Sequence, residues 1–243
     1  MSDHAPPLSI ILPAYNAAGF LRSSIAVLRE HRPRWPASEV LVVDDGSADD
    51  TAAVAAEFAS EGVRCLRLPR NRGKGGAVRA GMLEAKGAFR IFMDADIPYD
   101  LKAVDVMLRY LDVKEFDVVI GARNLPGSHF VVRLSAPRRL ASFVFTAFVS
   151  RLAVTGVADT QCGLKGFRGP AAERLFGLSV LDGFIFDVEV LYLAYKLNLD
   201  VKRIAVQQVR NEPSTISLPW HSVKMLKDLL GIPLRYYSGG YGL

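Results

Sequence analysis

Residues 90–97, Arg90-Ile-Phe-Met-Asp-Ala-Asp-Ile97, join an apolar run to two carboxylates. The run predicts a buried strand, and Asp94 and Asp96 follow where such a strand meets solvent. Residues two apart in an extended backbone point to the same face, so the two carboxylates converge on one point. Converging carboxylates repel unless a cation lies between them. The stretch therefore predicts a hard divalent cation that itself holds a substrate diphosphate, although two solvated aspartates in a surface turn fit the same short motif.

Apolar runs and amphipathic segments alternate through the first half of the chain. Expected strands span residues 8–12, 39–43, 63–68, 89–93 and 118–120, and expected helices span residues 17–30, 50–60 and 75–85. This alternation predicts crossover connections and a mostly parallel sheet, with ligands at the carboxyl ends of the strands. After a loop at residues 124–129, an apolar segment at residues 138–154 predicts a helix with arginines at both ends. The pattern favours a Rossmann-like α/β fold. The length alone allows one domain or two, and we expect a single domain, residues 1–243.

Composition limits the possible partners. Half of the 243 residues are hydrophobic, enough for a large core, and the net charge of +5 favours anionic partners such as phosphates or lipid headgroups. Basic residues are spread along the chain without a cluster of aromatic residues, so no nucleic-acid partner is expected. Two cysteines are too few for a disulfide scaffold, and neither a secretion signal nor a membrane span is evident. We therefore expect a cytoplasmic protein.

Two more expected strands end in polar or aromatic side chains. The first is followed by Pro13-Ala-Tyr-Asn16, where Tyr15 can stack on a base or simply cap the edge of the core. The second is followed by Asp44-Asp-Gly-Ser47, with two adjacent carboxylates at the mouth of the sheet. A carboxylate there can accept hydrogen bonds from a base or a ribose hydroxyl. Together with residues 90–97, these segments predict a nucleotide site at the strand ends.

A glycine-rich segment opens the third expected helix. Asn71-Arg-Gly-Lys-Gly-Gly-Ala-Val-Arg-Ala-Gly81 exposes backbone N–H groups at a helix start, and Lys74 adds positive charge. Its spacing does not match a P-loop. A sugar nucleotidyltransferase also combines a glycine-rich loop with metal-binding carboxylates, but its phosphate loop would follow the first strand. That position holds Pro13-Ala-Tyr15 in this chain.

Taken together, these motifs resemble the family 2 inverting glycosyltransferases with the GT-A fold. The resemblance covers roughly residues 8–235, and Gly121-Ala-Arg123 is similar to the family's Gly-Ser-Arg. Within the family, the chain looks most like the dolichyl-phosphate glucosyltransferases and their mannosyltransferase relatives. Three segments carry this closer resemblance: Asp159-Thr-Gln-Cys-Gly-Leu-Lys165, Phe186-Asp-Val-Glu-Val-Leu191 and Lys227-Asp-Leu-Leu230.

The resemblance implies a role for each matching position. About residues 8–125 would bind the nucleotide-sugar, and about residues 126–243 would bind the acceptor near a membrane. The donor-binding residues would be Pro13, Tyr15, Asp44, Asp45, Lys74 and Arg79. Asp94 and Asp96 would hold Mg²⁺ or Mn²⁺, and Arg123 would contact phosphate. The acceptor side would comprise Arg133, Ser135, Arg138, Asp159, Gln161 and Lys165.

The reaction implied by the resemblance moves a hexose, glucose or mannose, from a UDP- or GDP-sugar to a dolichyl or undecaprenyl phosphate. A phosphate acceptor is already ionised and needs little general-base help, whereas the leaving diphosphate needs charge stabilisation. Attack opposite the leaving group inverts the anomeric centre. Two alternatives stay open: a family 2 enzyme that acts on a non-lipid hydroxyl, and a non-catalytic module that binds nucleotide-sugars.

A lipid acceptor implies contact with a membrane surface. Two segments have suitable composition: the apolar residues 140–150, with arginines beside them, and residues 226–241, which are rich in aromatic side chains. Packing in the core would explain each segment equally well. We expect peripheral association with the inner face of the membrane.

Overall fold

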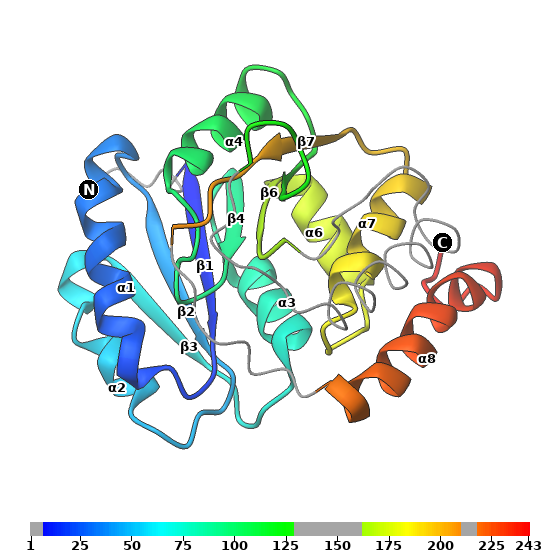
Figure 1. The fold of residues 1–243 in the computed structure, drawn as a ribbon, viewed down its shortest axis with the longest axis horizontal. Helices are drawn as coiled ribbons and strands as arrows, with labels where there is room; N and C mark the ends of the chain where they lie inside the picture. Colours follow the sequence, from blue (N-terminus) through cyan, green and yellow to red (C-terminus); the bar gives the residue numbers. More distant parts are fainter. Residues whose placement is uncertain (1–6, 129–161, 210–217) are drawn as a thin grey trace.

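One mixed sheet organises the protein. The structure is a computed structural model that describes residues 7–128, 162–209 and 218–243 (Figure 1). Within them, seven strands lie in the order β3-β2-β1-β4-β6-β5-β7. They are β1 (Leu8–Ala14), β2 (Glu39–Asp44), β3 (Val63–Arg67), β4 (Phe89–Met93), β5 (Val118–Ala122), β6 (Leu164–Arg168) and β7 (Val201–Ala205).

Helices cover both faces of this sheet (Figure 1). They are α1 (Ala18–His31), α2 (Thr51–Ala56), α3 (Lys74–Glu84), α4 (Lys102–Asp112), α6 (Gly169–Leu178), α7 (Phe186–Lys196) and α8 (Leu218–Tyr237), with short 3₁₀ turns at Arg32–Arg34 and Ala59–Glu61. Helices α1, α2 and α4 pack with one apolar cluster, and α3, α6, α7 and α8 pack with another. Successive residues of β1 alternate between them, because Ile11 joins the second cluster while Ile10 and Leu12 join the first. The expected α/β architecture is confirmed.

Parallel pairing brings the carboxyl ends of three strands to one end of the sheet, which we call the functional edge. β1 lies between β2 and β4, and both neighbours run parallel to it. Ala14, the last residue of β1, is paired with Asp44, the last residue of β2. The carboxyl ends of these three strands therefore open on the same edge, where a doubly wound sheet binds its ligands.

Strand β6 breaks the parallel pattern. It runs antiparallel to both β4 and β5, and Leu164 is paired with Met93. The start of β6 therefore adjoins the end of β4, which brings Gly163 next to Asp94. The sequence patterns did not predict this strand.

Most predicted boundaries in the first half are correct to within two residues. The exception is the helix expected at residues 50–60, which ends as α2 at Ala56 and continues as a 3₁₀ turn. Gly62 ends that turn with a left-handed φ of 77°. Elements α4, β6, α6, α7, β7 and α8 were not predicted, and the helix expected at residues 138–154 lies outside the described residues.

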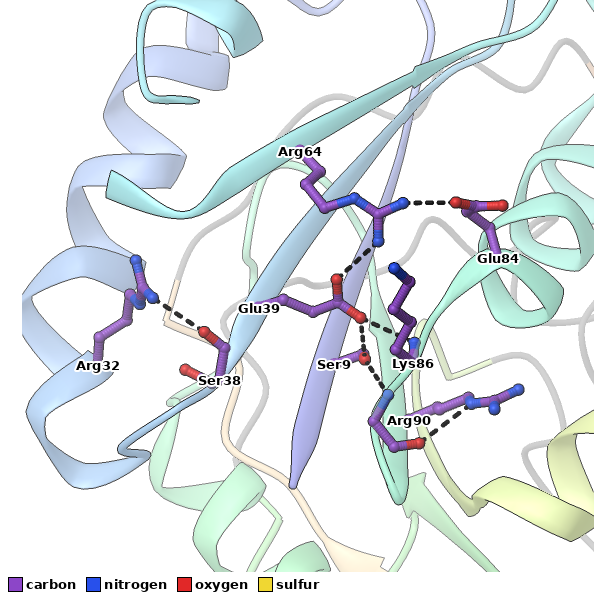
Figure 2. Close-up of polar contacts among 9 residues, drawn as sticks. Ser9, Arg32, Ser38, Glu39, Arg64, Glu84, Lys86 and Arg90 are labelled. Atoms are coloured by element: carbon purple, nitrogen blue, oxygen red, sulfur yellow. Dashed lines mark hydrogen bonds and ion pairs between the residues drawn. The ribbon is translucent and has the colours of Figure 1, made fainter. Parts of the chain in front are cut away.

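A polar network around Glu39 connects the amino ends of the strands, at the end of the sheet opposite the functional edge (Figure 2). The Glu39 carboxylate accepts hydrogen bonds from Ser9 Oγ at 2.6 Å, the Lys86 backbone N–H at 2.9 Å and Arg64 Nη1 at 2.8 Å. These contacts join β1, β2 and β3 to the connection between α3 and β4. They lower the pKa of Glu39, although burial acts in the opposite direction.

Candidate active site

The paired aspartates lie at the carboxyl end of β4, as the sequence predicts. Asp94 directly follows the strand, and its backbone N–H donates to the Gly163 carbonyl at 3.1 Å. The Ile97 N–H returns to the Asp94 carbonyl at 3.0 Å, and Ile97 has a positive φ of 47°. This tight turn holds Asp94 and Asp96 partly exposed at the functional edge.

Gly163 packs directly against the Asp94 carboxylate. A Cβ at this position would lie 1.8 Å from Asp94 Oδ2, so any side chain would displace the carboxylate. Its N–H donates to the Tyr99 hydroxyl at 3.3 Å. Burial raises the pKa of Tyr99 far above its ordinary value, and Cys162 and Asp94 raise it further, so the hydroxyl keeps its proton. The sequence patterns did not predict either residue as part of the site, although the Thr-Gln-Cys-Gly motif was a signal for Gly163.

The glycine-rich segment reaches the aspartates through Lys74. Gly73, with φ of 89°, precedes α3, and Lys74 opens the helix. The Lys74 Nζ lies 2.5 Å from Asp94 Oδ1. Burial lowers the pKa of Lys74, but the carboxylates of Asp94 and Asp187 outweigh that effect and the pKa is raised. Lys74 therefore stays protonated and contacts Asp94 as a cation.

Asp45 holds the glycine-rich loop in place. Its two carboxylate oxygens accept the backbone N–H groups of Arg72 and Gly73, each at 2.8 Å. Burial raises the pKa of Asp45 and the charges of Asp182 and Asp44 add to this, while the two N–H groups oppose it. Its carboxylate is thus already engaged by the protein backbone, and its expected contact with a nucleoside stays a prediction.

Asp44 is buried and supports the turn after β2. It accepts the Ser47 backbone N–H at 2.9 Å, and Arg67 Nε lies 3.3 Å from its second oxygen. Ser47 Oγ in turn accepts the Asn16 N–H at 2.9 Å, which links this turn to the loop after β1. Pro13 lies within β1, whereas Tyr15 beyond it is 52% exposed. The tyrosine ring is therefore accessible for stacking against a ligand.

Two basic side chains that were expected to bind ligand, Arg79 and Lys165, contact protein groups. Arg79 donates to Asp182 and, at 3.2 Å, to the Ser179 carbonyl, so it ties α3 to the segment before α7. Lys165 is fully buried on β6, and its Nζ donates to Asp187 Oδ1 at 2.6 Å and to the Cys162 carbonyl at 2.7 Å. Its ammonium is thus already engaged by protein groups in the core, and its expected place on the acceptor side stays a prediction.

Arg123 directly follows β5 and is exposed. Its charge acts on the Tyr99 hydroxyl, which places it near the aspartate pair. The remaining acceptor-side residues of the sequence prediction lie outside the described residues: Arg133, Ser135, Arg138, Asp159 and Gln161.

The aspartate pair suits a metal that brings its own further ligands. In the described part of the chain, no three His, Cys, Asp or Glu side chains come together to hold an ion. Asp94 Oδ1 already pairs with a cation, the Lys74 ammonium. Gly163 has no side chain, and its backbone packs directly against the Asp94 carboxylate. Mg²⁺ is commonly held by one or two carboxylates, water and substrate phosphates, and this donor set fits that pattern.

A sheet edge that combines partly exposed aspartates, a glycine-rich helix start and an accessible tyrosine defines a nucleotide-sugar-dependent glycosyltransferase of the GT-A fold. The model of the family described as glycosyl transferase family 2 matches residues 9–176. The chain belongs to this family.

Curated relatives match nearly the whole chain. A dolichyl-phosphate beta-glucosyltransferase of Dictyostelium discoideum is 35% identical over 96% of this chain and 75% of its own length. The human and Saccharomyces cerevisiae proteins of that name are 34% and 31% identical, over 97% and 96% of this chain and 78% and 76% of their own lengths.

Solved structures confirm the fold. Glucosyl-3-phosphoglycerate synthase from Mycobacterium tuberculosis, solved with UDP, superposes with a TM-score of 0.67 at 19% identity, covering 93% of this chain and 79% of that one. Mannosyl-3-phosphoglycerate synthase from Rubrobacter xylanophilus gives 0.64 at 21% identity, covering 95% and 72%. Other structures of the mycobacterial enzyme contain Mn²⁺ or Mg²⁺ with UDP.

Proposed function

We propose that this enzyme transfers glucose from UDP-glucose to a polyprenyl phosphate of the dolichyl type, with inversion at the anomeric carbon. The observation that carries the proposal is near-full-length similarity to dolichyl-phosphate beta-glucosyltransferases, combined with an intact aspartate pair at the end of β4. The mycobacterial structure with UDP-glucose and Mn²⁺ supports the choice of donor.

Asp94 and Asp96 are the proposed metal ligands. A bound Mg²⁺ or Mn²⁺ would neutralise charge that develops on the departing UDP. The chain's own part would be to orient the donor: the exposed Tyr15 would stack on the base, and Lys74 at the helix start would bring its ammonium to the diphosphate. Arg123, whose charge acts on the Tyr99 hydroxyl, would add positive charge for the phosphate groups.

The acceptor requires positive charge rather than a strong base, because a phosphate monoester is already ionised at neutral pH. Tyr99 is buried and its raised pKa keeps it protonated, so it would not act as a general base. We assign acceptor binding to Arg133, Ser135 and Arg138, with Asp159 and Gln161 at the sugar, as the family resemblance implies.

Membrane contact is proposed for the outer face of α8. No helix within the described residues is long and apolar enough to cross a bilayer. However, Leu226, Leu230, Leu234 and Tyr237 are all exposed, while Leu229 and Ile232 are buried. Their spacing of four, four and three residues forms one stripe on the helix. A stripe of this kind suits peripheral binding at the inner face of the membrane, beside the lipid acceptor.

A donor and acceptor panel tests the proposal. Purified protein with Mn²⁺ is supplied with UDP-glucose, GDP-mannose or UDP-N-acetylglucosamine, and with dolichyl phosphate, undecaprenyl phosphate or a soluble sugar hydroxyl acceptor. We expect glucosyl polyprenyl phosphate from UDP-glucose alone. Transfer only to the hydroxyl acceptor would instead favour a general family 2 enzyme, and binding of UDP-glucose without any product would favour a non-catalytic module.

A further inference from the structure

Four side chains of alternating charge run from the functional edge into the core. Asp94 is paired with Lys74 at 2.5 Å, and Asp187 is paired with Lys165 at 2.6 Å. The two pairs are neighbours: the charge of Asp187 raises the pKa of Lys74, and the charge of Lys74 lowers that of Asp187. The residues come from β4's end, α3's start, α7 and β6, so four separate elements meet in this row.

The inner pair is far less accessible than the outer pair. The side chains of Lys165 and Asp187 are 1% and 4% exposed, whereas those of Lys74 and Asp94 are 22% and 31% exposed. Lys165 also donates to the carbonyl of Cys162, the residue before Gly163. A fully buried ion pair adds little net stability, but removing one partner is costly. The inner pair is therefore costly to break, whereas the outer pair is open to exchange with a bound ligand.

The outer pair is incompatible with a metal on the same oxygen. Asp94 Oδ1 has an ammonium at 2.5 Å. A divalent cation bound to that oxygen would lie about 2.0–2.6 Å from it, so two cations would share one carboxylate oxygen and repel each other. Metal binding must therefore displace Lys74, which then needs another anionic neighbour.

We propose that Lys74 occupies the metal position at Asp94 until metal and nucleotide arrive, and that Asp187 is the internal partner that retains Lys74 after its displacement. The inference rests on the proposed function for the metal at Asp94. It makes Lys74 a competitor of the free metal ion and a ligand of the diphosphate once the donor is bound. Free metal is then bound weakly, and metal with UDP is bound well.

Mn²⁺ binding measured by electron paramagnetic resonance tests the competition without any turnover. In the absence of UDP, Lys74→Met should bind Mn²⁺ about fivefold or more tightly than the wild type, because the competing cation is gone. With UDP present, this advantage should disappear or reverse. Lys86→Met is the matched control: it removes the same charge from an exposed lysine at the opposite edge of the sheet and should leave Mn²⁺ affinity unchanged (Figure 2).

The role of Asp187 is tested in the same assay by a double-mutant cycle. As a single change, Asp187→Asn should weaken Mn²⁺ binding, because the displaced Lys74 has lost its partner. Added to Lys74→Met, the same change should have little effect on Mn²⁺ binding. An equal loss in both backgrounds would reduce Asp187 to a structural residue and overturn its assignment. If Lys74→Met binds free Mn²⁺ no better than the wild type, the competition itself is refuted. Sugar transfer by the wild type reports on the proposed function separately, so the two can fail independently.

Discussion

Gly163 and Asp94 share a contact that no other residue at position 163 would permit. An added Cβ would lie 1.8 Å from Asp94 Oδ2 and 2.4 Å from its Cγ. Because Leu164 begins β6 and Cys162 is buried, the backbone has little freedom to retreat. The glycine of the distinctive Thr-Gln-Cys-Gly motif therefore has a physical explanation, because only a residue without a side chain fits against the Asp94 carboxylate.

Replacing Gly163 by alanine should displace the Asp94 carboxylate and lower kcat by roughly 10²-fold, the usual consequence of misplacing a reacting group by about 1 Å. Steady-state kinetics with UDP-glucose and a polyprenyl phosphate would measure the effect. Gly177→Ala in α6 is the control, because a Cβ there meets nothing within 4 Å. Normal kcat in Gly163→Ala would show that Asp94 has no critical position.

Asp96→Asn should reduce transfer by roughly 10²-fold or more, because a metal contributes several kcal/mol to the stabilisation of the leaving group. The thermal midpoint should change little, since Asp96 is partly exposed. Asp112→Asn, an exposed aspartate at the end of α4, makes the same chemical change away from the site. Full activity of the Asp96 variant, or of the wild type in excess EDTA, would exclude the metal assignment.

Glu39→Gln should destabilise the protein by about 1–3 kcal/mol at pH 7, because the carboxylate accepts a charged donor and two neutral donors. The folded-state pKa of Glu39 is lowered. Its stabilising contribution is therefore complete above the unfolded pKa and is lost as pH falls through the folded value. Urea unfolding across this pH range should show the difference from the wild type shrinking in acid.

The exposed Glu30→Gln variant controls for the general effect of removing a carboxylate. It should unfold like the wild type at every pH. A Glu39 variant with a constant deficit from pH 7 into acid would mean that hydrogen bonding to the neutral side chain, rather than its charge, stabilises this edge.

Leu230→Ser with Leu234→Ser should weaken binding to anionic liposomes by roughly tenfold or more, because each leucine contributes about 1.5–3 kcal/mol when fully buried. Co-sedimentation at low and high salt would separate this apolar part from the screened electrostatic part. Leu83→Ser with Val113→Ser removes two equally exposed apolar side chains from α3 and the end of α4. Equal losses in both double variants would argue against a specific α8 surface.

Local patterns predicted the outer framework of the site but not its interior. The apolar runs at β1, β2 and β4 and the polar residues after them depend on period and strand position, which are local properties. The aspartate pair was placed correctly for this reason. Burial of Asp44 and Asp45 was not foreseen, because backbone groups up to 28 residues away satisfy them.

Lys165 shows where local reasoning fails. Its strand, Leu164–Arg168, contains a lysine and a glycine, and neither favours a central strand. The charge of Lys165 is balanced by Asp187, which is 22 residues away on α7. Helix α7 is equally unusual, since Asp187 and Glu189 are buried within it. The pairing is tertiary, so neither segment reveals it alone.

The configuration of the product tests the central claim most directly. The protein is incubated with UDP-glucose, whose glucose is α-linked, dolichyl phosphate and Mn²⁺, and the isolated lipid product is examined by proton and phosphorus NMR. We predict a single glucosyl phosphodiester in the β configuration. An α-linked product, or glucose transferred to a hydroxyl acceptor while dolichyl phosphate stays unmodified, would contradict the account.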